Sequence, residues 1–289
     1  MEPSILIIGS TGTVGRELVK ILLSKGIRPR ALLRPGSKLP ADIKDGVEMV
    51  RGDLSDEESL RNALKDIDQV FLLSRDQPRQ AELEENVIRI AEQQAVRKIV
   101  KSSAFAAGLS PPVGYGINHA KIESRLKNSS LQWLIQRPFV FMQNFLEVAD
   151  LVNNKGLLPL PFGNANIALI DARDVALAAS MLLLERDTSG EIFELTGPES
   201  LSVAECASIL SEVLQKKVTY RSPPFWFAGL MMRIQGVSPW DIKMRKDLFR
   251  MVRQGGEANT SGDFENICAT KPRDFRTFVR DYKNDFLQA

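Results

Sequence analysis

The stretch that decides the fold is Ile5-Leu-Ile-Ile-Gly9-Ser-Thr-Gly12-Thr-Val-Gly15, near the start of the chain. An apolar run of strand type gives way to three glycines spaced three residues apart. The residues that follow, Arg16-Glu-Leu-Val-Lys-Ile-Leu-Leu23, repeat apolar side chains at helical spacing. We therefore predict a strand, a tight turn and a helix in direct succession.

A turn of this kind is suited to hold a phosphate. Glycines let the backbone approach a pyrophosphate closely, and the free N–H groups at the start of a helix attract its negative charge. We expect a dinucleotide to contact every residue of the turn: Gly9, Ser10, Thr11, Gly12, Thr13, Val14 and Gly15. The alternative is an ordinary glycine-rich turn, because a glycine pattern alone has little specificity.

Charge and composition exclude several classes of protein. The 289 residues hold 38 basic and 36 acidic side chains, so the chain has no strong overall field that would attract nucleic acid or a membrane surface. No apolar stretch is long enough to cross a bilayer, and the first residues lack the pattern of a signal peptide. We expect a soluble protein without nucleic-acid or membrane partners.

Three residues limit the chemistry further. Cys206 and Cys268 lie far apart without metal-ligand spacing, so neither a disulfide framework nor a metal site is expected, and a reduced, cytoplasmic setting is the simplest interpretation. His119 is the only histidine. Any catalytic triad or multi-histidine metal site would have to include this residue, which excludes most such sites.

Beyond the first helix, strand and helix patterns alternate. Expected strands cover 29–33, 47–51, 69–73, 98–101 and 130–138, and expected helices cover 56–65, 80–94 and 117–126. Such alternation favours right-handed crossovers and a parallel sheet that binds its ligand at the carboxyl ends of the strands. We predict an α/β fold: a Rossmann-type, doubly wound parallel sheet with a smaller, mixed α/β C-terminal cap.

The predicted domains are not continuous in sequence. Residues 1–150 form the nucleotide-binding domain, to which 166–196 are expected to return, and residues 151–165 and 197–289 form the smaller substrate region. Two helices rich in aromatic residues and methionine after Pro223 are interpreted as a substrate cap, and a simple packing subdomain is the alternative. Shorter predictions here are a turn at 153–156, a strand at 167–170, a capping box from Ser202 to Glu205 and a closing helix over 272–286.

The end of the second strand indicates which dinucleotide is bound. An acidic residue about 20 residues beyond the glycines would accept the ribose hydroxyls of NAD, whereas an arginine accommodates the 2′-phosphate of NADP. Arg34 stands there and Lys38 follows closely. We therefore expect a preference for NADP(H), with NAD(H) as the second choice; two solvated loop cations are the alternative.

Further cofactor contacts are expected where the later strands end. These residues are Asp53, Leu54, Leu73, Ser74, Ser103, Ala104 and Pro138. Asp53 is equally suited to bind the adenine or to cap the next helix. Beyond the sixth strand, Phe141, Asn144 and Phe145 are expected to line the substrate site, although aromatic residues more often form ordinary core.

The motifs that carry a family resemblance run through nearly the whole chain. They are Gly9-x-x-Gly12-x-x-Gly15, Arg34, Gly52-Asp53-Leu54, Lys98-Ile-Val-Lys-Ser-Ser103, His119-x-x-x-Glu123, Arg137-Pro138 with Phe141-Met142-x-Asn144, and Asp171-Ala-Arg-Asp174-Val-Ala. In this order they resemble the atypical short-chain dehydrogenase/reductases, and within them the NmrA-like group of NAD(P)H-dependent quinone and azo-type reductases and redox-sensing regulators. The resemblance implies a bound NAD(P) and, for the reductases, hydride transfer to a planar acceptor.

The candidate catalytic pair is Tyr115 and His119, which are four residues apart and can share a helix face. The superfamily pattern is Tyr-x-x-x-Lys, in which the lysine lowers the pKa of the tyrosine and binds the nicotinamide ribose. His119 stands in place of that lysine and is also a cofactor candidate through the ribose hydroxyls. A structural histidine beside a loop tyrosine is the alternative. Quinone reduction depends less on this pair, because a quinone already accepts hydride well.

Two functions follow from these patterns. The first is an NADPH-dependent oxidoreductase that passes hydride to a quinone or a similar planar acceptor. The second is a non-enzymatic, NAD(P)-binding redox sensor that acts through a protein partner. The incomplete Tyr-x-x-x-Lys pattern favours the sensor, and the aromatic cap favours the enzyme. A homodimer is also left open.

Overall fold

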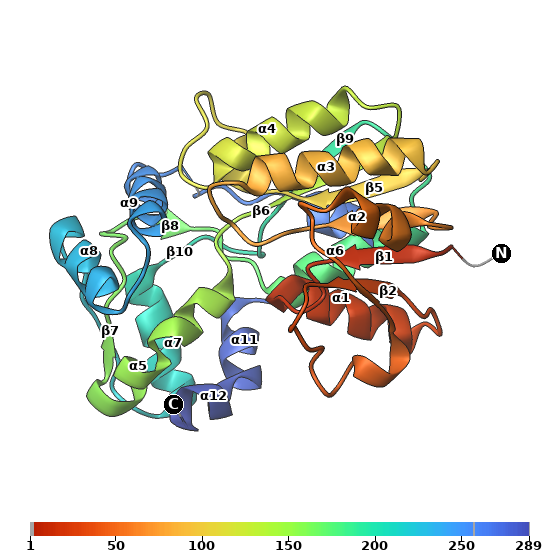
Figure 1. Ribbon diagram of the computed structural model, residues 1–289. Coiled ribbons are helices and arrows are strands. Elements are labelled where there is room, and N and C mark those ends of the chain that lie inside the picture. The colour runs from red at the N-terminus through yellow and green to blue at the C-terminus, as the bar shows by residue number, and fades with distance from the viewer. Residues whose placement is uncertain (1–2, 257, 289) are drawn as a thin grey trace. The chain divides into compact units, whose positions relative to one another are not determined.

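The centre of the fold is a seven-stranded sheet, seen in the computed structural model, which describes residues 3–256 and 258–288 (Figure 1). Its strands are β1 (Ile5–Ile8), β2 (Arg30–Leu33), β3 (Glu48–Arg51), β4 (Gln69–Leu72), β5 (Lys98–Ser102), β6 (Gln132–Pro138) and β9 (Glu191–Leu195), in the order β3-β2-β1-β4-β5-β6-β9. Strands β1 to β6 pair in parallel. This order, with its reversal beside β1, is that of a doubly wound dinucleotide-binding fold and confirms the predicted fold class.

Helices cover both faces of this sheet. They are α1 (Thr13–Ser24), α2 (Glu57–Leu64), α3 (Gln80–Gln93), α4 (Gly116–Lys127) and α6 (Ala172–Leu184), with two short 3₁₀ turns, η1 (Lys44–Gly46) and η2 (Phe105–Ala107). Helices α2, α3 and α4 share one apolar core with alternate strand residues such as Leu6 and Ile8, while α1 packs against α6 on the opposite face. Because successive strand residues point to opposite faces, the continuous apolar run of β1 serves both layers.

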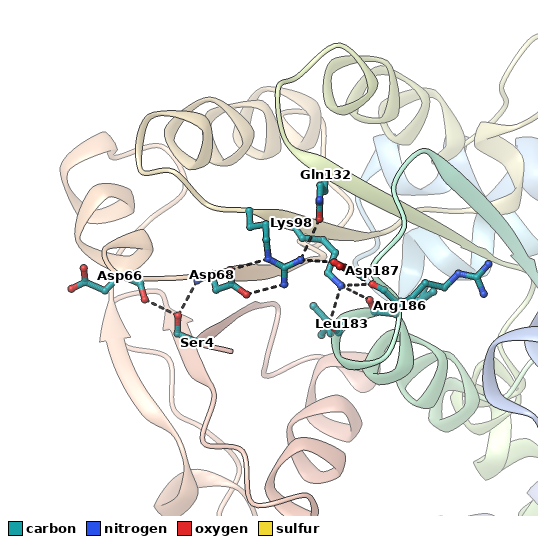
Figure 2. Close-up of polar contacts among 10 residues, drawn as sticks. Ser4, Asp66, Asp68, Lys98, Gln132, Leu183, Arg186 and Asp187 are labelled. Carbon is teal, nitrogen blue, oxygen red and sulfur yellow. Dashed lines mark hydrogen bonds and ion pairs between the residues drawn. The ribbon is translucent and has the colours of Figure 1, made fainter. Parts of the chain in front are cut away.

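The amino ends of the strands are joined by a polar cluster (Figure 2). Arg97 donates to both carboxylate oxygens of Asp68, at 3.1 and 3.0 Å, and to Asp187 and Gln132. Lys98, which is 1% exposed, donates from Nζ to the carbonyls of Leu182, Leu183 and Arg186 at 2.8–2.9 Å. The ammonium therefore caps the carboxyl end of α6, although burial lowers the pKa of Lys98 to about 8.

Contacts divide the chain into two compact units. The first comprises 1–108, 116–137 and 172–193, and the second comprises 109–115, 138–171 and 194–289. The predicted functional division, with a nucleotide domain of 1–150 joined by 166–196, stays a prediction. Within the part of the chain that the structure describes, no helix is long and apolar enough to cross a membrane.

The second unit is mixed α/β and has its own aromatic core. Its elements are the 3₁₀ segment η3 (Met142–Val148), α5 (Ala149–Lys155), β7 (Leu157–Leu158), β8 (Asn166–Ile167), β10 (Leu201–Ser202), α7 (Val203–Leu214), β11 (Thr219–Tyr220), α8 (Phe225–Ile234), α9 (Pro239–Arg253), α10 (Asp263–Cys268), α11 (Phe275–Asp281) and α12 (Lys283–Gln288). Phe145, Phe275, Phe278 and Phe286 are fully buried together. The capping box between Ser202 and Glu205 at the start of α7 is confirmed.

Three local predictions in this unit were wrong. Residues 153–155 are the last turn of α5, and only Gly156, at φ +58°, turns the chain. The predicted closing helix over 272–286 is two helices, because α11 ends at Asp281 and α12 begins at Lys283. Of the predicted strand 167–170, only Ile167 lies in a strand, β8, which pairs with β10. Ile170 forms an isolated bridge with Phe141.

Candidate functional site

The glycine turn lies at the carboxyl end of β1, where the strand order reverses between β1 and β4. Gly9 has φ +90°, and a Cβ placed there would lie 2.1 Å from the carbonyl oxygen of Leu73. A Cβ on Gly15 would lie 2.2 Å from the carbonyl oxygen of Gly9. The first glycine therefore allows the turn to cross β4, and the last brings α1 against the turn. Both contacts require glycine, which explains the first and the last glycine of the motif.

The first turn of α1 has the properties of an anion-binding site. Its N-cap is Gly12, so no side chain caps the first N–H groups, and no acidic residue stands in the first turn. Thr11, Gly12 and Thr13 are exposed, while Val14 and Gly15 anchor the helix in the core. Uncapped N–H groups and the positive end of the helix dipole together favour a bound phosphate.

Ser10 adds a second observation at the same turn. Its side chain is 1% exposed, yet its hydroxyl has no hydrogen-bond partner among the described residues. Buried hydroxyls are nearly always satisfied, so an unpaired one beside open N–H groups indicates a missing partner. A dinucleotide phosphate supplies acceptor oxygens of the required kind. The residues present therefore fit the cofactor that the sequence predicts.

Arg34 and Lys38 lie beyond the end of β2 on an ordered turn. Ser37 N donates to Arg34 O at 3.0 Å, and Gly36 between them has φ +80°. Both cationic side chains are exposed, and neither forms an ion pair within residues 3–256 and 258–288. Two unpaired cations at this strand end are what a 2′-phosphate would need, so the predicted NADP(H) contact has suitable groups in place.

The loop after β3 shows what Asp53 does in the folded chain. Its Oδ1 accepts from Ser55 N at 2.8 Å and from Ser55 Oγ at 2.6 Å, and these bonds lower the pKa of the Asp53 carboxyl, with a smaller contribution from Arg34. The cap of α2 is Asp56, not Asp53. The helix-capping alternative was therefore wrong, and adenine binding by Asp53 and Leu54 stays a prediction.

Two buried carboxylates support the strand ends on either side of β5. Glu84 of α3 accepts from Ser74 N and Oγ at 3.0 and 2.8 Å, and its other oxygen lies 2.7 Å from Lys101 Nζ, with both charged side chains fully buried. This network fixes the backbone and the hydroxyl of Ser74 next to half-buried Leu73. The orientation of Ser74, a predicted cofactor residue, thus depends on a buried carboxylate that also faces Lys101.

The second buried carboxylate is Glu123 of α4, which is 2% exposed. It accepts from Ser103 Oγ at 2.7 Å, from Arg137 Nε and Nη2 at 2.9 and 2.6 Å, and from Lys127 at 3.2 Å. Burial raises the pKa of the Glu123 carboxyl, but the Arg137 and Ser103 hydrogen bonds outweigh it and hold that pKa below its ordinary value. Ser103, with Ala104 after it, is therefore rigidly placed.

His119 is buried, at 3% exposure, on the inner face of α4 in line with Ile122 and Leu126. Its Nε2 lies 3.3 Å from Asp76 Oδ1, and its Nδ1 has no hydrogen-bond partner in the described chain. Asp76 follows β4, so the pair belongs to the same edge of the sheet as the glycine turn. The unpaired Nδ1 is available to a ribose hydroxyl or to a proton, and both roles stay predictions.

Tyr115 belongs to the second unit and precedes α4, so it is not a residue of the helix that carries His119. Its ring meets Trp240 edge-on with centroids 5.6 Å apart, and its hydroxyl donates to Asp241 Oδ1 at 3.4 Å. Of the predicted pair, only His119 therefore lies on the inner face of α4. A catalytic role for Tyr115 stays a prediction.

The predicted substrate residues of the second unit differ in exposure. Asn144 is exposed and Phe141 is half-buried. Phe145 is fully buried, and its ring centroid lies 4.8 Å from that of Phe275, as the core alternative requires. Pro138 is buried at the end of β6. A substrate role for Phe141 and Asn144 stays a prediction.

Several other charged groups of the second unit have partners within it. Asp171 is fully buried and accepts from Gln143 Nε2 at 2.9 Å, as a structural carboxylate would. On α9, Lys243 and Arg250 both pair with Asp247. No cluster of three or more metal-ligating side chains occurs within residues 3–256 and 258–288.

Three residues that shape this edge have no recognised motif in the sequence. They are Arg51, which bonds the turn after β2, Glu84, which holds Ser74, and Asp76, which faces His119. Arg51 and Asp76 each lie at or just after the end of a strand, so their position in the sequence was a usable signal. Glu84 gave no such signal, because it lies within an ordinary amphipathic helix.

Comparison with known proteins identifies the family. The profile of the NmrA-like family matches residues 1–284. The chain belongs to the NmrA-like family. Two relatives are a (4-alkanoyl-5-oxo-2,5-dihydrofuran-3-yl)methyl phosphate reductase of Streptomyces griseus and an NAD(P)H azoreductase of Xenophilus azovorans. The first is 33% identical over 98% of this chain and 99% of its own, and the second is 32% identical over 75% of this chain and 76% of its own.

A solved structure supports the fold of this NmrA-like protein. The NADPH complex of the quinone oxidoreductase QOR2 from Escherichia coli superposes with a TM-score of 0.87 and 24% sequence identity, covering 97% of this chain and all of that one. At this identity the match shows the fold alone. The function depends on the geometry of the site itself.

Proposed function

We propose that this protein is an NADPH-dependent oxidoreductase that transfers a hydride to a quinone or a similar planar acceptor. The single observation that carries the proposal is the uncapped first turn of α1 beside the unpaired, buried hydroxyl of Ser10. These groups are suited to a pyrophosphate, and no other described part of the chain combines an open helix start with a glycine turn at the reversal of the strand order.

The preference for NADPH rests on the turn after β2. Arg34 and Lys38 are exposed and unpaired, and Arg34 replaces the acidic residue that would accept the ribose hydroxyls of NAD. The names of the relatives agree with this class, because one is an NAD(P)H azoreductase and the other a reductase. Their own substrates differ, so the planar acceptor is a proposal for this chain.

The bound cofactor would supply the hydride from nicotinamide C4. The chain's own contribution is placement: the glycine turn would hold the pyrophosphate, Ser74 and Ser103 are fixed by Glu84 and Glu123, and His119 offers an unpaired Nδ1. No covalent bond to the protein is needed, since a quinone accepts hydride directly. The proton that completes the reduction would come from His119 or from water.

A titration with each cofactor and an acceptor screen test the proposal. NADPH should bind more tightly than NADH. A panel of quinones should oxidise NADPH only in the presence of the protein, which is measured as a loss of the absorbance of the reduced nicotinamide. If the protein binds NADPH but no acceptor in the panel is reduced, the assignment as an enzyme is wrong. The redox-sensor alternative gains no support from the two relatives described above, because both are named as reductases.

A further inference from the structure

Arg51 occupies a distinctive place at the carboxyl end of the sheet. It is the last residue of β3, the edge strand next to β2, and it lies in register with Leu33, the last residue of β2. Gly52 N continues the pairing by donating to Leu33 O at 3.0 Å. The exposed side chain of Arg51 therefore comes from the strand beside β2, and the turn that carries Arg34 follows β2.

The Arg51 side chain bonds both ends of that turn. Its Nη1 donates to Arg34 O at 3.1 Å and also to Ser37 O. The same two residues close the turn through their backbone, from Ser37 N to Arg34 O at 3.0 Å. Proline at the second position and glycine with φ +80° at the third are typical of a type II turn, so the turn is encoded locally. The bonds from Arg51 attach this turn to β3.

We propose that Arg51 is a positioning residue for NADPH specificity, acting through the backbone of Arg34 and Ser37. This inference rests on the proposed function. Arg34 and Lys38 have long, exposed side chains without ion-pair partners in the described residues, so a mobile turn would lose entropy when they close on a phosphate. Attachment to β3 orders the turn before the ligand binds. This lowers the entropic cost for a ligand that contacts Arg34 and Lys38.

The two reduced cofactors differ only by the 2′-phosphate, which makes the inference testable. NADH has only an uncharged 2′-hydroxyl at this turn, so its affinity should depend little on Arg51. NADPH should depend on the turn, because its extra phosphate requires Arg34 in place. The quantity to measure is therefore the ratio of the two dissociation constants.

Fluorescence titrations of the whole protein would give this ratio for the parent, Arg51→Ala and Arg51→Lys. We expect Arg51→Ala to lower the preference for NADPH about tenfold, with the Kd of NADH changed less than about twofold. Both bonds from Arg51 come from the single nitrogen Nη1, and a lysine ammonium has three donors, so Arg51→Lys should recover at least part of the preference. A lysine variant with as little preference as Arg51→Ala would contradict positioning through these two carbonyl bonds.

A double-mutant cycle with Arg34→Ala separates action through Arg34 from direct contact with the phosphate. If Arg51 positions Arg34, adding Arg51→Ala to Arg34→Ala changes the ratio little further. Independent, multiplying effects would mean that Arg51 binds the phosphate itself, which contradicts the inference. An equal loss of both cofactors would show a merely structural role.

Arg30→Ala is a matched control at the other end of the same two strands. Arg30 also bonds two carbonyls, those of Ala63 and Lys65, and pairs with Glu48, but at the amino edge. Its loss should leave the cofactor ratio unchanged. If the parent protein binds neither cofactor, the proposed function fails along with this inference; if the parent prefers NADPH and Arg51→Ala keeps that preference, only the inference fails.

Discussion

The two edges of the central sheet differ in how their polar groups are satisfied. At the amino edge, Arg97 binds Asp68 through both carboxylate oxygens, and Lys98 donates to three carbonyls at the end of α6. Ser4 donates from Oγ to Asp66 O and accepts from Asp68 N. An exception is Gln69, whose Oε1 lacks a partner. Most groups here are bonded to one another, so this edge contributes to stability.

At the carboxyl edge, buried polar groups of the predicted cofactor site remain without a partner. Ser10 Oγ and His119 Nδ1 are buried without partners in the described residues, and α1 begins uncapped. In contrast, Ser103 after β5 donates to Glu123 of α4, which also binds Arg137 of β6, although the Gln136 amide of β6 is buried without a partner. Each buried polar group without a partner calls for an explanation, and a bound ligand would supply one for Ser10. The difference indicates that stability and binding are separated along the same strands.

The largest expected effect is on the amino edge. Lys98→Met should lower the free energy of unfolding by about 3 kcal/mol, because three carbonyls at the end of α6 lose their donor. Urea unfolding would measure this, with Lys65→Met, an exposed lysine of the same unit, as the control. The folded variant should bind NADPH within about twofold of the parent. A large loss of affinity would break the separation between the edges.

The next effect tests the engaged part of the carboxyl edge. Glu123→Gln should lower stability at neutral pH by about 2 kcal/mol, because Arg137 and Lys127 lose their anion. The folded pKa of Glu123 lies below its ordinary value of 4.5, so the ionised group stabilises the fold above that value and this contribution is lost as the pH falls through and below it. Unfolding curves from neutral to acidic pH should therefore converge for parent and variant; a constant difference would contradict the assignment.

A third change should separate stability from binding at the start of α1. Thr13→Asp places a negative charge in a first turn that has none, which should stabilise the helix by about 0.5 kcal/mol. The same charge would repel a pyrophosphate and should weaken NADPH binding about tenfold or more. Thr13→Asn, which is similar in size but neutral, is the control. Unchanged affinity in Thr13→Asp would mean that no phosphate binds there.

The smallest effect concerns two buried serines. Ser10→Ala removes a hydroxyl without a partner, so stability should stay within about 0.5 kcal/mol of the parent, while NADPH affinity falls about fivefold. Ser103→Ala removes a hydroxyl that donates to Glu123 and should cost about 1 kcal/mol of stability. Thermal unfolding and titration of both variants would compare them directly. Equal losses of stability would show that Ser10 has a partner in solution.

Local patterns predicted the sheet well because each strand and helix of the first unit has its own signal. The glycine turn, Arg34 at the strand end and the capping box at Ser202 all depend on neighbours in the sequence. The errors lie where tertiary packing decides the boundary. Residues 153–155 look like a turn but extend α5, and the segment after Asp274 breaks into two helices around a shared phenylalanine core.

The sequence by itself determined the glycine turn, the fold class and the cations after β2, because backbone conformation and strand order follow from local residue types. Tertiary structure alone decided which polar groups find partners. Arg51 reaches the turn of Arg34 from another strand, Glu84 holds Ser74 from α3, and Ser10 stays unpaired although it is buried. These facts depend on side chains that meet across the fold, and no spacing along the chain records them.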